Sequence, residues 1–313
     1  MCGIAGIADM HGTAAIDPSE LRAMASMLRH RGPDQTGIYV DDTVGLAHNR
    51  LSIVDLKAGA QPLCNEDRTI WICYNGEVYN YPELRRTLCS HGHRFHTGTD
   101  TEVLVHLYEE RGEGFPGALN GQFALALWDS RLRRLLLARD RMGIRPLHYT
   151  CHGTRLVFGS EIKAIFTVQG IPRRLDPRGL AQICTLWTTL PGRTAFEGVY
   201  EIPAAHYMIV DRHGVRLRRY WTLPHREQGQ GMERSPKQVA AQVRGLLTDA
   251  VRIRLRADVP VGAYVSGGLD SSIIATIAAS KSAPGLRTFG VRFGDLLYDE
   301  GEQQRQVVDR LGT

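Results

Sequence analysis

The hydrophobic pattern of the chain changes its period partway along, and this change limits the fold more than any other feature. Up to about residue 200, short apolar runs such as Ile4–Ala8 and Phe123–Trp128 alternate with amphipathic segments such as Pro18–Arg29. From residue 235 the order becomes helix, apolar strand, Gly-rich turn and helix. The first pattern predicts an α+β layered domain of antiparallel strands with segregated helices. The second predicts the start of an α/β domain with a parallel sheet.

The other elements follow from the same periodicities. Helices are predicted at Tyr81–His91 and Asp100–Arg111, and a strand at Ile70–Tyr74 that meets a turn at Asn75-Gly76. In the second part, Ser235-Pro236 is a typical helix start, and strands are predicted at 259–265 and 286–293. Pro, Gly and polar residues become frequent between these parts. The predicted division is a domain at 1–205, a linker at 206–234 and a second domain at 235–313.

Composition excludes several classes of function. The net charge is +5 over 313 residues, but the arginines are scattered, which indicates a solvated surface and no nucleic-acid site. No apolar run approaches the roughly 18 residues of a membrane span.

The six cysteines form no CxxC pair, which predicts a reduced, cytoplasmic protein with most thiols packed in the core. The segment from His91 to His96 holds three histidines at a spacing that fits no standard zinc set, so we expect a solvated turn there.

Cys2 follows the first methionine directly. Removal of Met1 would leave a residue with both a thiol and a free α-amine. Such an amine has a pKa of about 7.7–8.0, so it can accept the thiol proton near neutral pH. A nucleophile of this type carries its own base. Taken alone, Cys2 is weak evidence for such a nucleophile, and a buried residue at the start of the first strand is the favoured interpretation.

Several separate motifs accompany Cys2 in a specific order. They are Cys2-Gly-Ile-Ala-Gly6, Arg29-His-Arg-Gly-Pro-Asp34, Leu46-Ala-His-Asn-Arg-Leu-Ser-Ile53, Asn75-Gly-Glu77 and Thr99-Asp100. In this combination the chain resembles the class II (N-terminal nucleophile) glutamine amidotransferases, and most of all the glutamine-hydrolysing asparagine synthetases. The resemblance extends from residue 2 to the end of the chain.

The resemblance implies a role for each of these residues. Cys2 would be the nucleophile, with the Asn75 side chain and the Gly76 N–H as oxyanion donors. Arg50 would bind the α-carboxylate of glutamine. Asp100 and Glu77 would bind its α-ammonium, and the backbone of Leu51, Ile53 and Val54 would line the pocket. Residues 29–34 would form a lid. The alternatives are a plain hairpin turn at Asn75-Gly76, surface ion pairs at Arg50 and Asp100, and a helix end at 29–34.

A Gly-rich segment joins the predicted strand at 259–265 to a helix. Two glycines, three hydroxyls and a helix N-terminus are features that attract a phosphate, although the segment fits neither a Walker loop nor GxGxxG. It resembles the pyrophosphate-binding loop of ATPases that form acyl-adenylates, with ATP and Mg²⁺ as cofactors and Asp270 at the magnesium–pyrophosphate end. The implied ATP-binding residues are Val265, Ser266, Gly267, Gly268, Leu269, Asp270, Ser271, Ser272 and Val291. The alternative is a strand–helix turn without a ligand.

Together, the resemblances imply an αββα N-terminal-nucleophile domain followed by a truncated parallel-sheet PP-loop ATPase domain. The implied reaction uses glutamine, aspartate and ATP: glutamine yields ammonia at Cys2, and the ammonia converts β-aspartyl-AMP to asparagine. The implied protein binds no nucleic acid and no membrane, and a homodimer is compatible with it. Because only the first elements of the second domain are present, we expect residues 1–313 to complete only the glutaminase half.

Other functions remain open on the sequence alone. One is an ATP-dependent amidotransferase that amidates a different carboxylate. Another is a truncated remnant with a regulatory or binding role. Relatives with sugar-phosphate partner domains are disfavoured by the Ser266–Ser272 loop, and β-lactam-forming relatives are disfavoured by Cys2.

Overall fold

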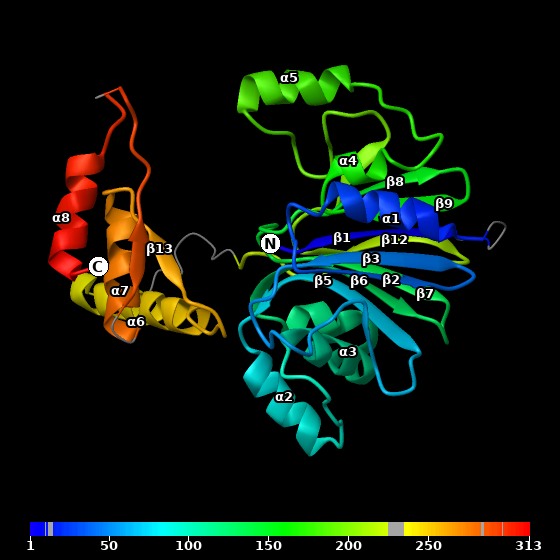
Figure 1. Cartoon of the computed structure of the whole chain (residues 1–313), viewed down its shortest axis with the longest axis horizontal. Coiled ribbons are helices and arrows are strands. Elements are labelled where there is room, and N and C mark those ends of the chain that lie inside the picture. Colours follow the sequence, from blue (N-terminus) through cyan, green and yellow to red (C-terminus); the bar gives the residue numbers. More distant parts are fainter. Residues whose placement is uncertain (10, 12–14, 225–234, 283–284, 296) are drawn as a thin grey trace. The chain divides into compact units, whose positions relative to one another are not determined.

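The computed structural model describes residues 1–313 except 10, 12–14, 225–234, 283–284 and 296. The chain forms two compact units, Met1–Leu223 and Pro224–Thr313 (Figure 1). None of the described helices is both long enough and apolar enough to cross a bilayer.

The first unit is built on two six-stranded sheets whose paired strands run antiparallel. The first sheet has the strand order β10-β8-β9-β1-β3-β2 and the second has the order β12-β11-β7-β6-β5-β4. The strands of the first sheet are β1 (Gly3–Asp9), β2 (Gln35–Val40), β3 (Val44–Arg50), β8 (His148–His152), β9 (Arg155–Gly159) and β10 (Val199–Glu201). Those of the second are β4 (Leu63–Cys64), β5 (Ile70–Val78), β6 (Gly121–Asp129), β7 (Arg134–Arg139), β11 (His206–Asp211) and β12 (Gly214–Arg219).

Helices cover the outer face of each sheet (Figure 1). Helices α1 (Pro18–Met27) and α4 (Ile162–Ile165) share a buried cluster with the first sheet. Helices α2 (Tyr81–Ser90) and α3 (Asp100–Arg111) pack on the second sheet, followed by a 3-10 turn at Gly112–Ala118. A third apolar cluster lies between the sheets. The predicted layered α+β architecture is therefore confirmed. Helix α5 (Pro177–Leu186) was not predicted.

Strand β6 shows how the second sheet is covered on both faces, by helices on one side and by the first sheet on the other. Alternate side chains point to opposite faces of a strand. Phe123, Leu125 and Leu127 belong to the cluster under α3, whereas Ala124 and Ala126 belong to the cluster between the sheets. A strand covered on both faces needs apolar residues throughout, which explains the unbroken run of this segment.

The expected turn at Asn75-Gly76 is wrong, as is the hairpin-turn alternative. Strand β5 continues through both residues to Val78, and Gly76 pairs with Phe123 of β6. A Cβ atom at position 76 would lie 2.2 Å from the carbonyl oxygen of Gln122. Glycine is therefore required here by the close approach of the neighbouring backbone, and not by a turn.

Two further expectations are corrected. The predicted linker began at residue 206, but residues 206–211 and 214–219 form β11 and β12, because the alternating apolar residues of β11 are buried. The last part of that linker, 225–234, lies outside the described residues. All six cysteines are free as expected, but only Cys73 is buried, so most thiols are not core groups.

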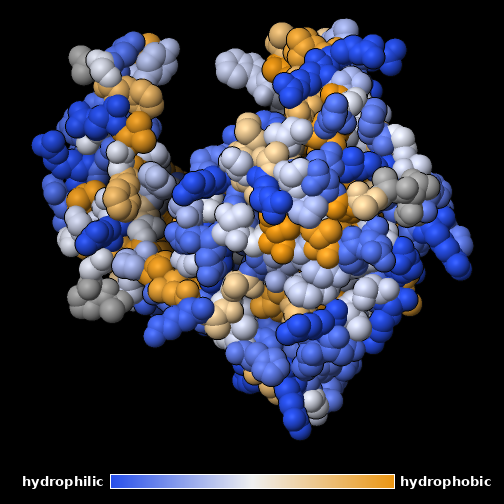
Figure 2. Space-filling view, turned by 45° about the vertical axis from the view of Figure 1, so that its right-hand side comes forward, coloured by the Kyte–Doolittle hydropathy of each residue, from blue (hydrophilic) through white to orange (hydrophobic). Residues whose placement is uncertain are grey.

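The second unit contains helices α6 (Pro236–Arg254), α7 (Leu269–Lys281) and α8 (Gly301–Leu311) and two short parallel strands, β13 (Gly262–Tyr264) and β14 (Arg287–Phe289). Both strands are shorter than predicted. Helix α6 begins with a capping box between Ser235 and Gln238, as its sequence indicates. Several large apolar side chains of this unit are exposed, including Tyr264, Leu269 and Leu297. Figure 2 shows such hydrophobic patches among a largely hydrophilic exterior.

Candidate active site

One cavity of the first unit is lined by every residue that the sequence predicts for glutamine binding and hydrolysis. These residues are Cys2, Arg50, Leu51, Ile53, Val54, Asn75, Gly76, Glu77 and Asp100. They come from the residue before β1, the end of β3 and the segment after it, the second half of β5 and the start of α3. The folded chain thus brings together positions that are almost one hundred residues apart.

Cys2 precedes β1 and is held from two sides. Its Sγ accepts a hydrogen bond from the Leu51 N–H at 3.3 Å. Its carbonyl oxygen accepts one from Arg31 Nε at 2.9 Å. Burial raises the pKa of the Cys2 thiol, so the sulfur needs a base in order to react near neutral pH. Arg31 belongs to the segment that the resemblance describes as a lid.

Arg50 is the last residue of β3 and is almost completely buried. Its Nη2 donates to the carbonyl oxygens of Val54 at 3.1 Å and Asp55 at 2.7 Å. The guanidinium therefore fixes the loop that lines one wall of the cavity. Asp100 is also buried, so the alternative of surface ion pairs at these two positions is wrong.

The edge of β5 faces the cavity with backbone donors. The Tyr74 N–H donates to Gln61 Oε1 at 2.7 Å, and the Val78 N–H donates to Asp100 Oδ2 at 2.9 Å. Both N–H groups therefore point away from β6. Since N–H direction alternates along a strand, the Gly76 N–H midway between them points the same way. Because Gly76 lines the cavity, we infer that its N–H is a donor that faces the cavity.

Asn75 supplies a second donor. Its side chain is 1% exposed. Its Nδ2 has no hydrogen-bond partner among the residues that the structure describes. Leaving a buried amide N–H unpaired costs about 1–3 kcal/mol. Such an atom in the wall of a cavity is therefore a place where a ligand acceptor would be stabilised.

Asp100 opens helix α3, whose N-cap is Thr99. Its Oδ2 also accepts the Tyr74 hydroxyl at 2.8 Å. Burial raises the pKa of Asp100, while the hydrogen bonds from Val78 and Tyr74 act in the opposite direction. The helix N-terminus further favours the carboxylate form.

The sequence did not single out every residue of the cavity. The additional residues are Met1, Gly59, Gln61, Tyr74, Thr99, Thr101 and Arg145. Thr99 stands in a motif that carried the resemblance, but Gln61, Tyr74 and Arg145 belong to none. Their place depends on long-range packing, which leaves no local signal.

The Gly-rich loop of the second unit follows β13 and opens α7. Gly267 has a φ of 87°, which other residues rarely adopt, and Gly268 is the N-cap. The Ser271 hydroxyl accepts from the Ser266 N–H at 3.1 Å, and the Ser272 hydroxyl donates to the Gly268 carbonyl at 2.7 Å. Val265 is buried. The other predicted ATP-binding residues of the loop are partly or fully exposed, as is Val291 beyond β14.

Two protein-family models match separate parts of the chain. The model of the glutamine amidotransferase domain family matches residues 1–221. The chain belongs to this glutamine amidotransferase family. The model of the asparagine synthase family matches residues 242–313.

Relatives of this amidotransferase chain include asparagine synthetases and amidases. Asparagine synthetase [glutamine-hydrolyzing] 3 of Bacillus subtilis is 40% identical over 282 residues, which are 89% of this chain and 45% of that protein. Asparagine synthetase B of Escherichia coli is 37% identical, over 90% of this chain and 46% of that protein. Amidase chry2 of Gibberella zeae is 37% identical, over 100% of this chain and 50% of that protein. The chain spans about half the length of these relatives.

A solved structure supports the fold. Glutamine phosphoribosylpyrophosphate amidotransferase of B. subtilis superposes with a TM-score of 0.52 at 18% identity, over 97% of this chain and 70% of that chain. At this identity the likeness concerns the fold alone. The recognition of the amidotransferase and asparagine synthetase families from the sequence is confirmed.

Proposed function

We propose that the first unit hydrolyses glutamine at Cys2 and that its ammonia serves the synthesis of asparagine from aspartate and ATP. The observation that carries the glutaminase proposal is the buried Nδ2 of Asn75, which lacks a partner among the described residues and lies in the wall of the cavity that Cys2 also lines. An oxyanion in that cavity would pair this donor. The neighbouring Gly76 N–H would supply the second hydrogen bond.

The proposed reaction has two steps. After Met1 is removed, the α-amine of Cys2 takes the thiol proton, and Sγ attacks the side-chain carbonyl carbon of glutamine. The oxyanion of the tetrahedral intermediate is stabilised by Asn75 and Gly76. When the intermediate collapses, the C–N bond breaks, the amine returns its proton to the leaving nitrogen, and ammonia departs. Water then hydrolyses the γ-glutamyl thioester, which releases glutamate and restores the thiol.

The remaining cavity residues would orient the substrate. Arg50 carries the cation suited to the α-carboxylate of glutamine. Asp100 carries the anion suited to the α-ammonium, with Glu77 beside it. The backbone of residues 51, 53 and 54 would contact the side chain of the substrate. Each of these residues lines the cavity.

The second unit would bind MgATP through the Ser266–Ser272 loop, in the manner of a PP-loop ATPase. Its N-cap Gly268 and the hydroxyl groups of the loop suit a pyrophosphate. Asp270, in the first turn of α7, is the carboxylate that could meet the magnesium ion of this substrate. Aspartate would then be activated as its adenylate and attacked by ammonia.

A second acceptor is supported by one observation. The relatives include amidases chry2 and chyE, which match 100% of this chain at 37% and 35% identity. An acceptor other than aspartate is therefore the competing proposal for the whole protein. Exchange of pyrophosphate into ATP that depends on aspartate would favour asparagine synthesis, and exchange that aspartate does not stimulate would favour the alternative.

The glutaminase proposal is tested with Asn75→Ala. Loss of one oxyanion donor should lower kcat for glutamate release about 100-fold or more while KM changes little, because the donor acts on the transition state. Unchanged kcat in a folded variant would remove Asn75 from the mechanism. MgATP binding is tested separately with Asp270→Asn, which should weaken binding while glutamate release stays at the parental rate.

A further inference from the structure

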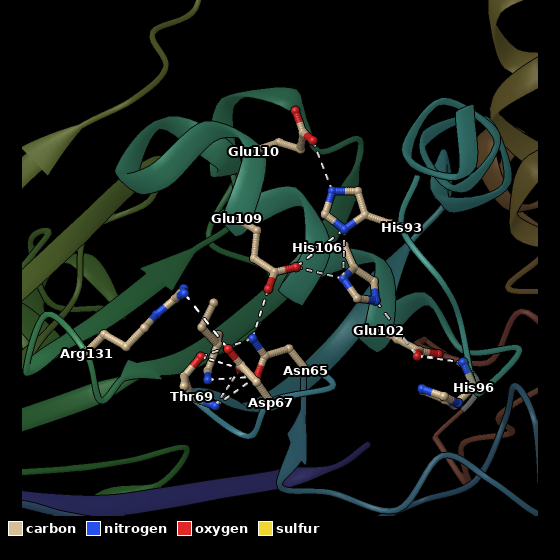
Figure 3. A network of polar contacts seen from close by, with 11 residues as sticks. Asn65, Asp67, Thr69, His93, His96, Glu102, His106, Glu109, Glu110 and Arg131 are labelled. Carbon is tan, nitrogen blue, oxygen red and sulfur yellow. Dashed lines mark hydrogen bonds and ion pairs between the residues drawn. The ribbon is translucent and has the colours of Figure 1, made fainter. Parts of the chain in front are cut away.

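Three donor atoms converge at a place that the glutaminase cavity does not include. They are His93 Nδ1, from the turn after α2, and His106 Nδ1 and Glu109 Oε2, from α3. The two nitrogens are 3.2 Å apart. The carboxylate oxygen lies 2.8 Å from His106 Nδ1 and 3.5 Å from His93 Nδ1 (Figure 3). His106 and Glu109 share one face of the helix because they are three residues apart.

The size of this triangle suits a tetrahedral metal ion. Zinc–nitrogen and zinc–oxygen bonds of about 2.0–2.1 Å place neighbouring ligand atoms roughly 3.3 Å apart. The three separations lie on either side of that value. Two imidazoles with one carboxylate are also a ligand set that zinc accepts, with the fourth position open.

The two rings face each other with the same nitrogen. When both imidazoles carry their hydrogen on Nε2, the two Nδ1 atoms and the carboxylate oxygen direct three lone pairs toward one point. A metal ion would satisfy all three lone pairs together. The side chains of His93, His106 and Glu109 are only 16%, 1% and 20% exposed, so the site is sheltered but open on one side.

We propose that His93, His106 and Glu109 bind a divalent transition metal ion, Zn²⁺, outside the glutaminase cavity. A solvent molecule would complete the coordination at the open position. This differs from the solvated turn expected from the sequence, because the decisive ligands His106 and Glu109 lie beyond the histidine-rich segment.

The surroundings of the three residues resemble an outer coordination shell. The far nitrogen of His93, Nε2, lies 3.0 Å from Glu110 Oε1. The far oxygen of Glu109 accepts from Asn65 Nδ2 at 2.8 Å. The far nitrogen of His106 is buried and lies 3.9 Å from Glu102 Oε1. The acceptor on the far nitrogen of His93 favours its Nε2–H tautomer, which turns the Nδ1 lone pair toward the shared point.

The proposed ion would have a structural role. It would fasten the turn after α2 to the body of α3. Glu102, beside His106, also accepts from the N–H groups of His96 at 2.8 Å and Thr97 at 2.7 Å. Those residues lead directly to Asp100 in the glutaminase cavity. The ion would thus stabilise the segment that enters α3.

The test measures Zn²⁺ bound to the full chain carrying Cys2→Ala, which removes the thiol of the cavity. Chelator-stripped protein is dialysed against Zn²⁺ and its metal content is determined. We expect one Zn²⁺ per chain at micromolar concentration. His93→Ala and Glu109→Gln should weaken binding at least 100-fold, and Glu110→Gln should weaken it about 10-fold. His96→Ala, a histidine of the same turn, is the matched control and should bind as the parent does.

Cobalt substitution gives a readout that does not depend on the folding of variants. The Co²⁺ form should show visible d–d bands without a thiolate charge-transfer band, because the ligands are nitrogen and oxygen. A parent chain that binds no Zn²⁺ at 100-fold higher concentration would overturn the proposal and leave a proton-sharing cluster. Equal binding by the parent and all variants, or a thiolate band, would also overturn it.

Discussion

Arg31 holds the backbone of Cys2: its Nε donates to the Cys2 carbonyl oxygen at 2.9 Å. The same guanidinium donates through Nη1 to Glu161 at 2.9 Å. Glu161 lies two residues after β9, whose last residue, Gly159, pairs with Ala5 of β1. The Arg31–Glu161 ion pair therefore helps to fix the position of the proposed nucleophile. The sequence motifs alone do not show this connection.

Removal of this contact should impair hydrolysis without removing any group that touches glutamine. Arg31→Ala is expected to lower kcat/KM for glutamine at least 10-fold, because small displacements of a reacting atom are costly. Lys163→Ala is the matched control: Lys163 also pairs with Glu161, at 2.9 Å, whereas the hydrogen bonds of Cys2 within the described part of the chain join it to Leu51 and Arg31. Parental kinetics in a folded Arg31→Ala protein would contradict this role.

Glu161 should also make stability depend on pH. Burial alone would raise the pKa of Glu161, but the cations of Arg31 and Lys163 outweigh it and lower the pKa to about 2. The ordinary glutamate value is about 4.3. A lowered folded-state pKa stabilises the protein above the unfolded-state value, and the contribution is lost as the pH falls toward the folded-state value. Glu161→Gln should therefore lower the urea midpoint at pH 7. The difference from the parent should shrink between about pH 4.3 and pH 2, and a difference independent of pH would contradict the ion pair.

The hydrogen bond between Tyr74 and Asp100 should tune glutamine binding. The Tyr74 hydroxyl favours the carboxylate form of Asp100, so Tyr74→Phe should raise the pKa of Asp100 further above its ordinary value. Fewer chains would then carry the anion proposed to bind the α-ammonium. KM for glutamine should rise about 10-fold, the scale of one hydrogen bond to a charged group, and the increase should be largest at low pH. A KM increase that is the same at every pH would point to a steric effect.

Gly76→Ala should destabilise the first unit. The new methyl group would lie 2.2 Å from the Gln122 carbonyl oxygen, and the paired backbone of β6 would have to move. Overpacking of this kind typically costs about 1–3 kcal/mol in the free energy of unfolding. Gly117→Ala is the control, since a Cβ there meets nothing within 4 Å. Urea unfolding of both variants checks this, and equal midpoints would show that β5 and β6 can separate.

Regular patterns predicted the elements well wherever one segment determines its own structure. The helix at Asp100–Arg111 and the run of β6 are examples, because periodicity and burial agree there. Asn75-Gly76 was misjudged because a dipeptide typical of turns is held straight by pairing with a distant strand. The linker was begun too early because β11 is recognised only once β7 covers it.

In the candidate site, too, residues within motifs could be predicted from the sequence, whereas residues placed by long-range packing could not. Cys2, Arg50, Asn75 and Asp100 stand in motifs and were found from them. Gln61 and Arg145 reach the cavity only through packing, and Arg31 reaches Cys2 through a bond that spans 29 positions. The metal-site proposal likewise needed the fold, because His93 and His106 lie 13 positions apart on separate elements.

The central claim is that Cys2 is the nucleophile that hydrolyses glutamine. The most direct test is the rate of glutamate release by Cys2→Ala beside the parent, with intact mass showing that Met1 has been removed from the parent. We predict steady glutamate release by the parent and a loss of at least about 1,000-fold in the variant, as for other enzymes that lose a catalytic nucleophile. Equal glutamate release from the two proteins would contradict the account.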